Sequence, residues 1–360
     1  MKTDFEVSHS TIKSIRKAIY DKRRKNCPPF PDSLASVMFQ LRQMEDNDCL
    51  KFKNEKFVHA PDDFQFICIT TKTNINILLQ CEDVFVDSTF EYAPKYFMQL
   101  YTIHGLKNGY YLPLVFFFLI DKFKETYIQM WTYLIKLCSK YSSEILNIKQ
   151  LHVDFEVAAH EAAKTVFPEV KIIGCQFHLG QAWWRKIQNH STLRTSYNNE
   201  DKLGQWLKLF FGLPFLPFDK VEDGFIQLMN LCPNEIEGHI FSDYILNTYI
   251  EPGCLFPPKI WAKEPSIIPR TTNGAKSFHK MYSGLFHRAH SPTHVVISIL
   301  KEIQVETMKK ICLISKGIIN KNMVLPDLKR IKASIKIYEQ YKIDENITMY
   351  LSEIGSIYQR

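Results

Sequence analysis

The sequence predicts an α/β fold, in which helices flank a mixed β-sheet. Between residues 83 and 177, apolar runs typical of strands alternate with segments whose apolar residues recur at helical spacing. The 360 residues are 46% hydrophobic and include 26 Phe and 17 Tyr, which is enough apolar material for a large core. The longest aliphatic and aromatic run, residues 110–120, is too short to cross a bilayer as a helix, so we expect no membrane partner.

The net charge and the cysteine content indicate which kind of partner and which cellular compartment to expect. The net charge of +7 is compatible with a polyanionic partner, although it does not identify one. The nine cysteines include no C-x-x-C pair, and an odd number of them in a chain of this size favours a reducing compartment, either the cytosol or the nucleus. We find no signal-peptide pattern at the N-terminus, which agrees with that expectation.

A basic segment opens the chain. Residues 1–26 contain eight Lys or Arg and three acidic residues, with a compact run at Lys22, Arg23, Arg24 and Lys25. This run fits a nuclear import signal or a phosphate contact, and it fits a solvated helix end equally well. After the helix-breaking C-P-P-F-P-D at 27–32, we expect a helix over 33–43 and short strands within 50–70. Residues 1–70 therefore form a basic N-terminal extension in this interpretation.

The order of the elements from residue 83 is more specific. We expect strands at 83–88, 97–104 and 110–120, a helix at 123–140, a strand at 149–154, a helix at 156–167 and a strand at 170–177. Three strands, helix, strand, helix, strand is the order of the ribonuclease H-like fold, where a meander of three strands is extended through helical crossovers. Residues 71–188 are therefore predicted to be a ribonuclease H-like core.

Two aspartates stand at the ends of expected strands. Asp87 ends the first strand and is followed by Ser88 and Thr89, a combination that is also common in ordinary turns. Asp154 ends the fourth strand, which lies beside the first in this fold. A carboxylate at the mouth of a buried strand is costly unless a metal ion or hydrogen bonds use it. Because the two would face each other, we favour a functional pair over a turn.

The segment C-Q-F-H at 175–178 has the spacing of metal ligands. Cys175 and His178 make up only half of a zinc site, and the distant pair His287 and His290 is a possible second half. Without that second half, the pair would have to act in another way.

An amphipathic helix is expected to follow directly. It contains Trp183 and Trp184, which more often pack into a core than stack on bases. Arg185 and Lys186 come next and are candidates for contact with DNA phosphates.

The second half of the chain is predicted to be helical. Helical patterns at 203–211, 218–231 and 234–250 alternate with proline-containing breaks, so we interpret 189–269 as a helical insertion into the sheet domain. Residues 270–287 begin with turn chemistry and become a helix, which we expect to be the last helix of the core within 270–300. Residues 301–360 are predicted to be a helical tail with a break at Pro326.

A set of motifs in a fixed order gives the chain a family resemblance. They are D-S-T-F at 87–90, Q-L-Y-T-I-H-G at 99–105, K-E-T-Y at 124–127, D-F-E at 154–156, G-C-Q-F-H-L-x-Q-A-x-W-R-K-I-Q at 174–188, P-P-K-I-W at 257–261 and R-T-T-N-G-A-x-S-F-H at 270–279. Together they closely resemble the transposase domain of Mutator-like elements (MULE), over roughly residues 30–300.

The resemblance implies a DDE-type nuclease and strand-transfer core that acts on DNA, either at transposon ends or non-specifically, in the nucleus. In such enzymes two Asp and one Glu hold two divalent ions, Mg²⁺ or Mn²⁺, that activate water or a 3′-hydroxyl. Asp87 and Asp154 match the first two carboxylates. His178 matches the His of the family's C-x-x-H, which is expected near the metals or the scissile phosphate. A homo-oligomer is possible.

One position departs from the family pattern. The third carboxylate belongs at the end of R-T-x-N-x-x-E, and here that position is Lys276, whose ammonium cannot ligate Mg²⁺. We therefore expect an impaired transposase core or, alternatively, a non-catalytic DNA-binding or protein-interaction module domesticated from one. We also expect Lys276 to lie between Asp87 and Asp154 as a built-in counterion.

Overall fold

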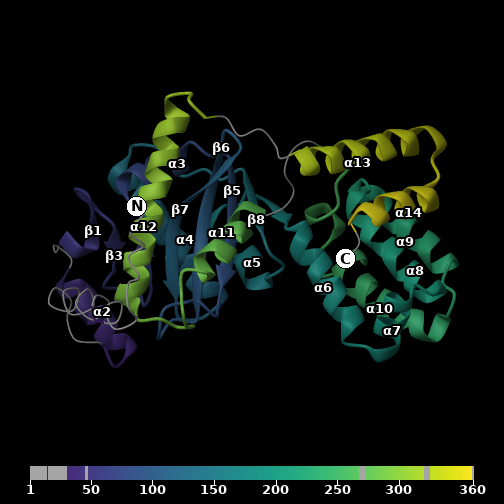
Figure 1. The fold of residues 1–360 in the computed structure, drawn as a ribbon, viewed down its shortest axis with the longest axis horizontal. Coiled ribbons are helices and arrows are strands. Elements are labelled where there is room, and N and C mark those ends of the chain that lie inside the picture. Colours follow the sequence, from purple (N-terminus) through teal and green to yellow (C-terminus); the bar gives the residue numbers. More distant parts are fainter. Residues whose placement is uncertain (1–13, 15–30, 45–47, 267–272, 320–324, 359–360) are drawn as a thin grey trace, which may run out of the picture.

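The computed structural model describes residues 14, 31–44, 48–266, 273–319 and 325–358. The basic run Lys22–Lys25 and the R-T-T at 270–272 lie outside these residues. Figure 1 shows a lobe built around the sheet and, beside it, a lobe made of helices. None of the helices in the described ranges combines the length and the apolar character that a membrane crossing requires.

Seven strands form the main sheet, in the order β3-β4-β7-β6-β5-β8-β9. Strands β5, β6 and β7 are an antiparallel meander, while β8 and β9 run parallel to β5, so the predicted mixed sheet is confirmed. The strands are β3 (Val58–His59), β4 (Ile67–Ile69), β5 (Asp83–Thr89), β6 (Gln99–Lys107), β7 (Tyr110–Leu119), β8 (Gln150–Val153) and β9 (Lys171–Gly174). A separate hairpin pairs β1 (Lys51–Phe52) with β2 (Glu55–Lys56).

Strand β7 is apolar on both faces because helices cover both sides of the sheet. Its Phe117 packs on one side, and Phe116 and Phe118 pack on the other. Pro113, which has no backbone donor, pairs with His104 at the one register shift between β6 and β7. A bulge of this kind is where a proline is tolerated inside a sheet.

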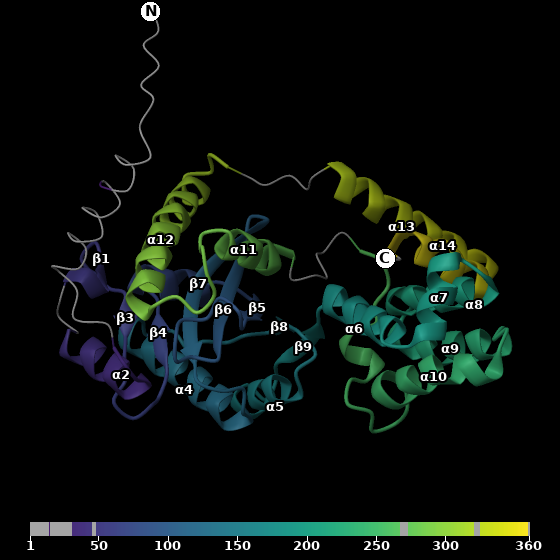
Figure 2. The ribbon, with the colours of Figure 1, turned by 60° about the horizontal axis from the view of Figure 1, so that its bottom comes forward.

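Helices cover each face of the sheet, as Figure 2 shows. One face packs against α3 (Lys72–Leu79), α4 (Lys124–Tyr141) and α5 (Val157–Val166), and the other against α2 (Leu34–Gln43), α11 (Asn273–Ser283) and α12 (Thr293–Ser315). Along β5 the side chains alternate between the faces. Val84 and Val86 belong to the core under α4 and α5, so Phe85 and Asp87 point toward the α11 face.

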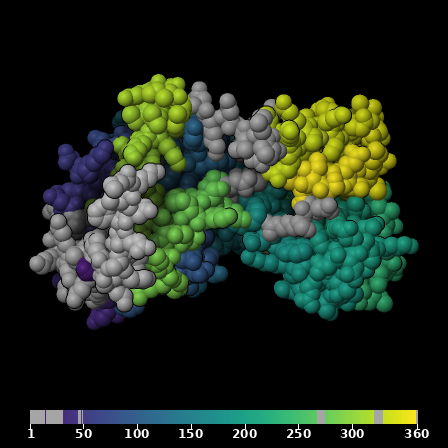
Figure 3. Space-filling model, viewed as in Figure 1, coloured from purple at the N-terminus to yellow at the C-terminus, as the bar shows by residue number. Residues whose placement is uncertain are grey.

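The helical lobe joins two segments that lie far apart in the sequence. It contains α6 (Gln176–Gln188), α7 (Ser191–Asn199), α8 (Lys202–Leu209), the 3₁₀ helix η2 (Phe210–Phe215), α9 (Val221–Asn230), α10 (Glu235–Ile245), the π-helical turn η4 (Leu246–Ile250), α13 (Leu325–Asp344) and α14 (Ile347–Tyr358). Figure 3 shows the C-terminal helices, in yellow, lying on the insertion.

Helix α14 packs directly on η2. The hydroxyl of Tyr350 donates to the carbonyl of Phe215 at 2.7 Å, and a Cβ on Gly212 would lie only 2.8 Å from the carbonyl oxygen of Leu351. This close approach requires glycine. Helix α14, which lies in the predicted helical tail, is therefore part of the core of the helical lobe.

Several element bounds differ from the sequence-based expectation. The strand expected over 170–177 ends at Gly174, because Cys175 takes the N-cap position of α6. Helix α12 runs without interruption through the expected boundary at residue 300. Strands β3 and β4, which lie within the predicted N-terminal extension, pair with one another, and β4 pairs with β7, so both belong to the same sheet as β5. Helices α3 and α7 were not anticipated.

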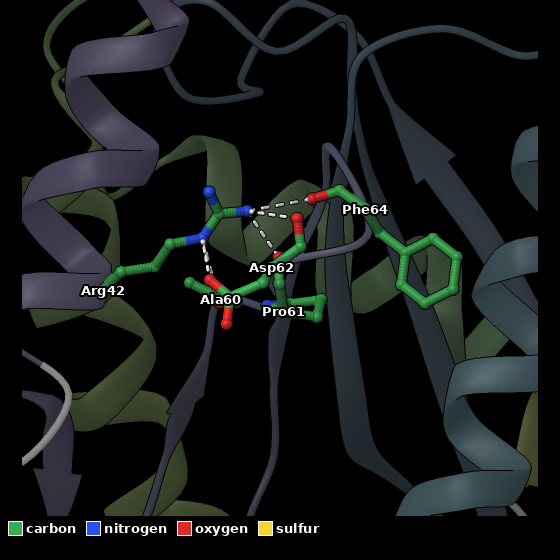
Figure 4. Close-up of polar contacts among 5 residues, drawn as sticks. All are labelled: Arg42, Ala60, Pro61, Asp62 and Phe64. Carbon is green, nitrogen blue, oxygen red and sulfur yellow. Dashed lines mark hydrogen bonds and ion pairs between the residues drawn. The ribbon is translucent and has the colours of Figure 1, made fainter.

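Arg42 ties α2 to the loop between β3 and β4. Its guanidinium nitrogens donate to the carbonyl oxygens of Ala60 (3.4 Å), Pro61 (2.5 Å), Asp62 (3.2 Å) and Phe64 (3.4 Å), as Figure 4 shows. A contact of 3.1 Å joins Nε to the carboxylate of Asp62. The five N–H donors of a guanidinium can bond to several carbonyl oxygens that lie in different directions. An ammonium cannot reach all of them from one position.

We predict that Arg42→Lys lowers the free energy of unfolding by about 1–3 kcal/mol, because carbonyls of the loop lose their donors. Urea unfolding measures this change. Asp62→Asn is the control and should cost less than about 1 kcal/mol, since that carboxylate is 87% exposed. If the two variants lost the same free energy of unfolding, the ion pair with Asp62, and not the hydrogen bonds to the carbonyl oxygens, would anchor the loop.

Candidate functional site

The parallel pairing of β5 with β8 brings the two predicted aspartates together. Val84 pairs with Leu151 and Phe85 with His152. The same register sets Asp87 level with Asp154, two residues further along the chain. Asp87 is inside β5 and only 8% exposed, whereas Asp154 follows the last residue of β8. The expectation that these strands are neighbours is confirmed.

Burial makes the negative charges of the pair costly. It raises the pKa of Asp87 to about 7, an effect to which the charge of Asp154 adds and which His178 opposes. The pKa of Asp154 is also raised, mainly by burial, with His178 again opposing and Glu156 adding to the shift. The pair therefore tends to hold a proton near neutral pH unless a cation is present.

Two histidines lie close to Asp87. The Nε2 atom of His178, in the first turn of α6, is 3.9 Å from Oδ1 of Asp87, and Nε2 of His279, on α11, is 4.0 Å from Oδ2. The Thr102 hydroxyl donates to the backbone carbonyl of Asp87 at 3.0 Å and lies 3.0 Å from Nε2 of His279. Since the Thr102 proton is used, Nε2 of His279 donates, and burial lowers the pKa of this ring to about 4.

Sequence reasoning did not single out His279. It is the last residue of R-T-T-N-G-A-x-S-F-H and stands three residues after Lys276. Residues three apart lie on the same side of a helix, and that spacing was the available signal.

Lys276 lies on α11 beside α6. Its ammonium is over the face of the Phe177 ring, and Phe177 is the neighbour of His178. Among the side chains that lower the pKa of the two aspartates, His178 has the largest effect on each. His178 and His279 thus each approach Asp87 to about 4 Å, and the Lys276 ammonium lies against the Phe177 ring.

The possible zinc site is not formed. Cys175 is buried at the start of α6, while His287 and His290 are exposed between α11 and α12. Within the described ranges, no group of three or more His, Cys, Asp or Glu side chains could hold a metal ion. The proposed pairing of C-x-x-H with H-x-x-H is therefore wrong, because the four side chains do not converge.

The carboxylate pair has the kind of ligand atoms that a divalent cation needs. Asp87 and Asp154 offer the hard oxygen donors that Mg²⁺ and Mn²⁺ prefer, and one or two carboxylates suffice for one ion when water completes its shell. The raised pKa of each Asp shows that a cation would relieve an unfavourable charge. On α11, Lys276 offers no oxygen ligand to such an ion.

The two tryptophans of α6 pack as the sequence predicted. Trp183 is fully buried, and its ring packs edge-on against Phe211, Tyr249 and Trp261. Trp184 is half-buried, with its ring centroid 4.9 Å from that of Tyr197.

The two cations that follow have different surroundings. Arg185 is exposed, whereas the Lys186 ammonium lies 5.3 Å from the centroid of the Tyr244 ring. Arg185 is thus the more accessible of the two predicted phosphate contacts.

Comparison with known families agrees with this geometry. The family model described as the MULE transposase domain matches residues 84–182. The matched segment runs from β5 into α6 and includes Asp87, Asp154 and the C-x-x-H pair, and it indicates a transposase-related function. Helix α11, with Lys276 and His279, lies outside it. No curated protein matches the chain.

We predict that Asp87→Asn stabilises the protein at high pH. The folded protein keeps a proton on Asp87 up to about pH 7, whereas an unfolded Asp loses it near 3.8, so the free energy of unfolding falls as pH rises through this window. Asn does not titrate. The free energy of unfolding of Asp87→Asn minus that of the parent should therefore be about 2–4 kcal/mol larger at pH 8 than at pH 4.

Urea unfolding at the two pH values measures this difference, with the exposed Asp63→Asn as the control. If Asp87→Asn changed stability by the same amount at both pH values, burial of the Asp87 carboxyl would not be the source of the pH dependence.

Proposed function

We propose that this chain is the ribonuclease H-like core of a MULE-type DDE DNA transposase whose metal-dependent strand cleavage is impaired. The observation that carries the proposal is the β5–β8 register, which sets Asp87, inside β5, beside Asp154, directly after β8. The family match over residues 84–182 and the nearness of His178 support it. In this interpretation the protein derives from a transposon.

Each residue of the site has a role in the proposal. Asp87 and Asp154 would hold Mg²⁺ or Mn²⁺, which supplies activation of water or a 3′-hydroxyl and stabilises charge at phosphorus. His178 would donate a hydrogen bond to the scissile phosphate. His279, through Thr102, would hold the Asp87 peptide in place.

The chemistry of two side chains supports impairment. Lys276 stands where the family has a carboxylate, so the third carboxylate of the family pattern is absent. The raised pKa of Asp87 means that a cation must displace a proton from this carboxyl when it binds, which weakens cation binding near neutral pH.

The alternative is a non-catalytic DNA-binding or protein-interaction module that keeps the fold. Lys276 favours it, since loss of one metal ligand removes catalysis without disturbing the sheet. The two candidates differ in strand cleavage, so a nicking assay with Mn²⁺ separates them.

We predict that Lys276→Glu creates a divalent-metal response that the parent lacks. Without metal, Glu at this position loses the cation–π contact with Phe177 and brings a negative charge near the pair, so the variant should melt earlier than the parent. With Mn²⁺ at 10–100 times its Kd, stability should recover by about 1–3 kcal/mol through ligand linkage, and nicking of supercoiled DNA should appear.

Lys280→Glu is the matched control, because it makes the same charge change one turn further along α11 at an exposed position. Lys280→Glu should show neither the stabilisation by Mn²⁺ nor the nicking of DNA. In the Lys276→Glu background, Asp87→Asn should abolish both of these responses to Mn²⁺. If the parent bound Mn²⁺ as tightly as Lys276→Glu, the assignment of Lys276 to the third ligand position would be wrong.

DNA binding is proposed to be salt-sensitive and largely independent of sequence. Arg185→Ala should lower the slope of log K against log salt by about one, equally for unrelated duplexes, because one phosphate contact is lost. Lys186→Ala should have a smaller effect, since its ammonium already lies against Tyr244.

Fluorescence anisotropy at several salt concentrations measures both slopes, with Lys136→Ala on α4 as an exposed control. Tight binding to one sequence with little salt dependence would contradict the proposal.

A further inference from the structure

The backbone of Asp154 is held by a side chain that contacts the helical lobe. Asp154 lies in the short connection between β8 and α5, and its carbonyl oxygen accepts a 2.6 Å hydrogen bond from Nε2 of His160. His160 is 5% exposed. Its ring packs edge-on against Phe256 of the insertion, with 5.6 Å between the centroids and 72° between the planes.

The next residue after Asp154 reaches the same phenylalanine. The Phe155 ring packs edge-on against Phe256, at 5.1 Å between centroids and 84° between planes, and against Tyr249 at 6.0 Å. Strand β9 leaves room for this ring only because its last residue is Gly174, where a Cβ would lie 2.7 Å from the Phe155 ring. Two independent contacts therefore connect the Asp154 peptide to one side chain of the insertion.

Phe256 is itself fixed by the helical lobe. Its N–H donates to the carbonyl of Thr248 at 3.1 Å, and its carbonyl accepts from Nε1 of Trp261 at 2.8 Å. Its ring lies nearly parallel to that of Tyr249, and only 6% of the residue is exposed. With both of its backbone groups bonded and its ring enclosed, Phe256 is a rigid support.

We propose that Phe256 is a positioning residue for Asp154, which it orients toward Asp87 through His160 and Phe155. The insertion then completes the carboxylate site, although it supplies none of the carboxylates. This inference rests on the proposed function only in treating the Asp87–Asp154 pair as the cation site. Mutation of residues that contact and orient the metal ligands, without binding the metal themselves, commonly changes metal affinity by 10–100-fold.

The first test compares Phe256→Leu with Phe225→Leu. Both phenylalanines are 6% exposed and belong to the insertion, but Phe225 packs on Phe210 of the lobe interior, away from the Asp154 peptide. Amide hydrogen exchange of residues 154–160 is measured against that of residues 84–88 in β5. Phe256→Leu should speed exchange at 154–160 about 10-fold relative to 84–88, and Phe225→Leu should leave that ratio unchanged even if it lowers the melting temperature as much.

The second test concerns the hydrogen bond of His160. His160→Gln keeps an N–H donor for the Asp154 carbonyl and should retain most of the protection, whereas His160→Leu removes the donor and should behave like Phe256→Leu. Equal exchange in Gln and Leu variants, or equal ratios in the two phenylalanine variants, would overturn the proposal, because the effect would then be general destabilisation.

The third test measures Mn²⁺ affinity by titration calorimetry in the Lys276→Glu background. Adding Phe256→Leu should weaken binding about 10-fold, and adding Phe225→Leu should not. Unchanged affinity with Phe256→Leu would overturn the positioning role. If Lys276→Glu bound no Mn²⁺ at all, the proposed function would fail, and the exchange ratios would still decide whether Phe256 holds the Asp154 peptide.

Discussion

The parallel pairing of β5 with β8 is the constraint on which the rest of the site depends. It stacks Phe85 on His152, with ring centroids 3.9 Å apart. Two residues further along the chain from each, it sets Asp87 beside Asp154. Two buried like charges repel each other, so the surrounding residues must offset that cost. His178 from α6 and His279 from α11 approach Asp87 from two different elements.

The requirement to enclose this pair also explains where α11 lies. On the face of the sheet that α11 covers, the polar residues Thr102 and His104 interrupt a surface that is otherwise largely apolar. His279 satisfies Thr102, and Phe278 packs edge-on against His104. A helix with Phe278 and His279 side by side covers apolar and polar patches of the sheet together, which a wholly apolar helix could not do.

Much of the sheet could be predicted from the sequence, because β5, β6 and β7 are long apolar runs and the helices between later strands have clear periodicity. The facing of Asp87 and Asp154 followed from that order. Strands β3 and β4 have only two and three residues, too few to carry a period, so their place in the sheet was not predictable. The approach of His279 to Asp87 and the separation of His287 from Cys175 depend on tertiary packing, which local spacing cannot reveal.

The packing of α14 on η2 affects the order in which the chain can fold. Residues 210–215 are apolar and fully enclosed in the finished protein, but their cover, residues 347–358, is synthesised much later. During translation the sheet lobe can form its meander early, while the helical lobe keeps an apolar surface open to solvent. The helical lobe therefore cannot close before its C-terminal helix is made, and its closure is a late, long-range step of folding.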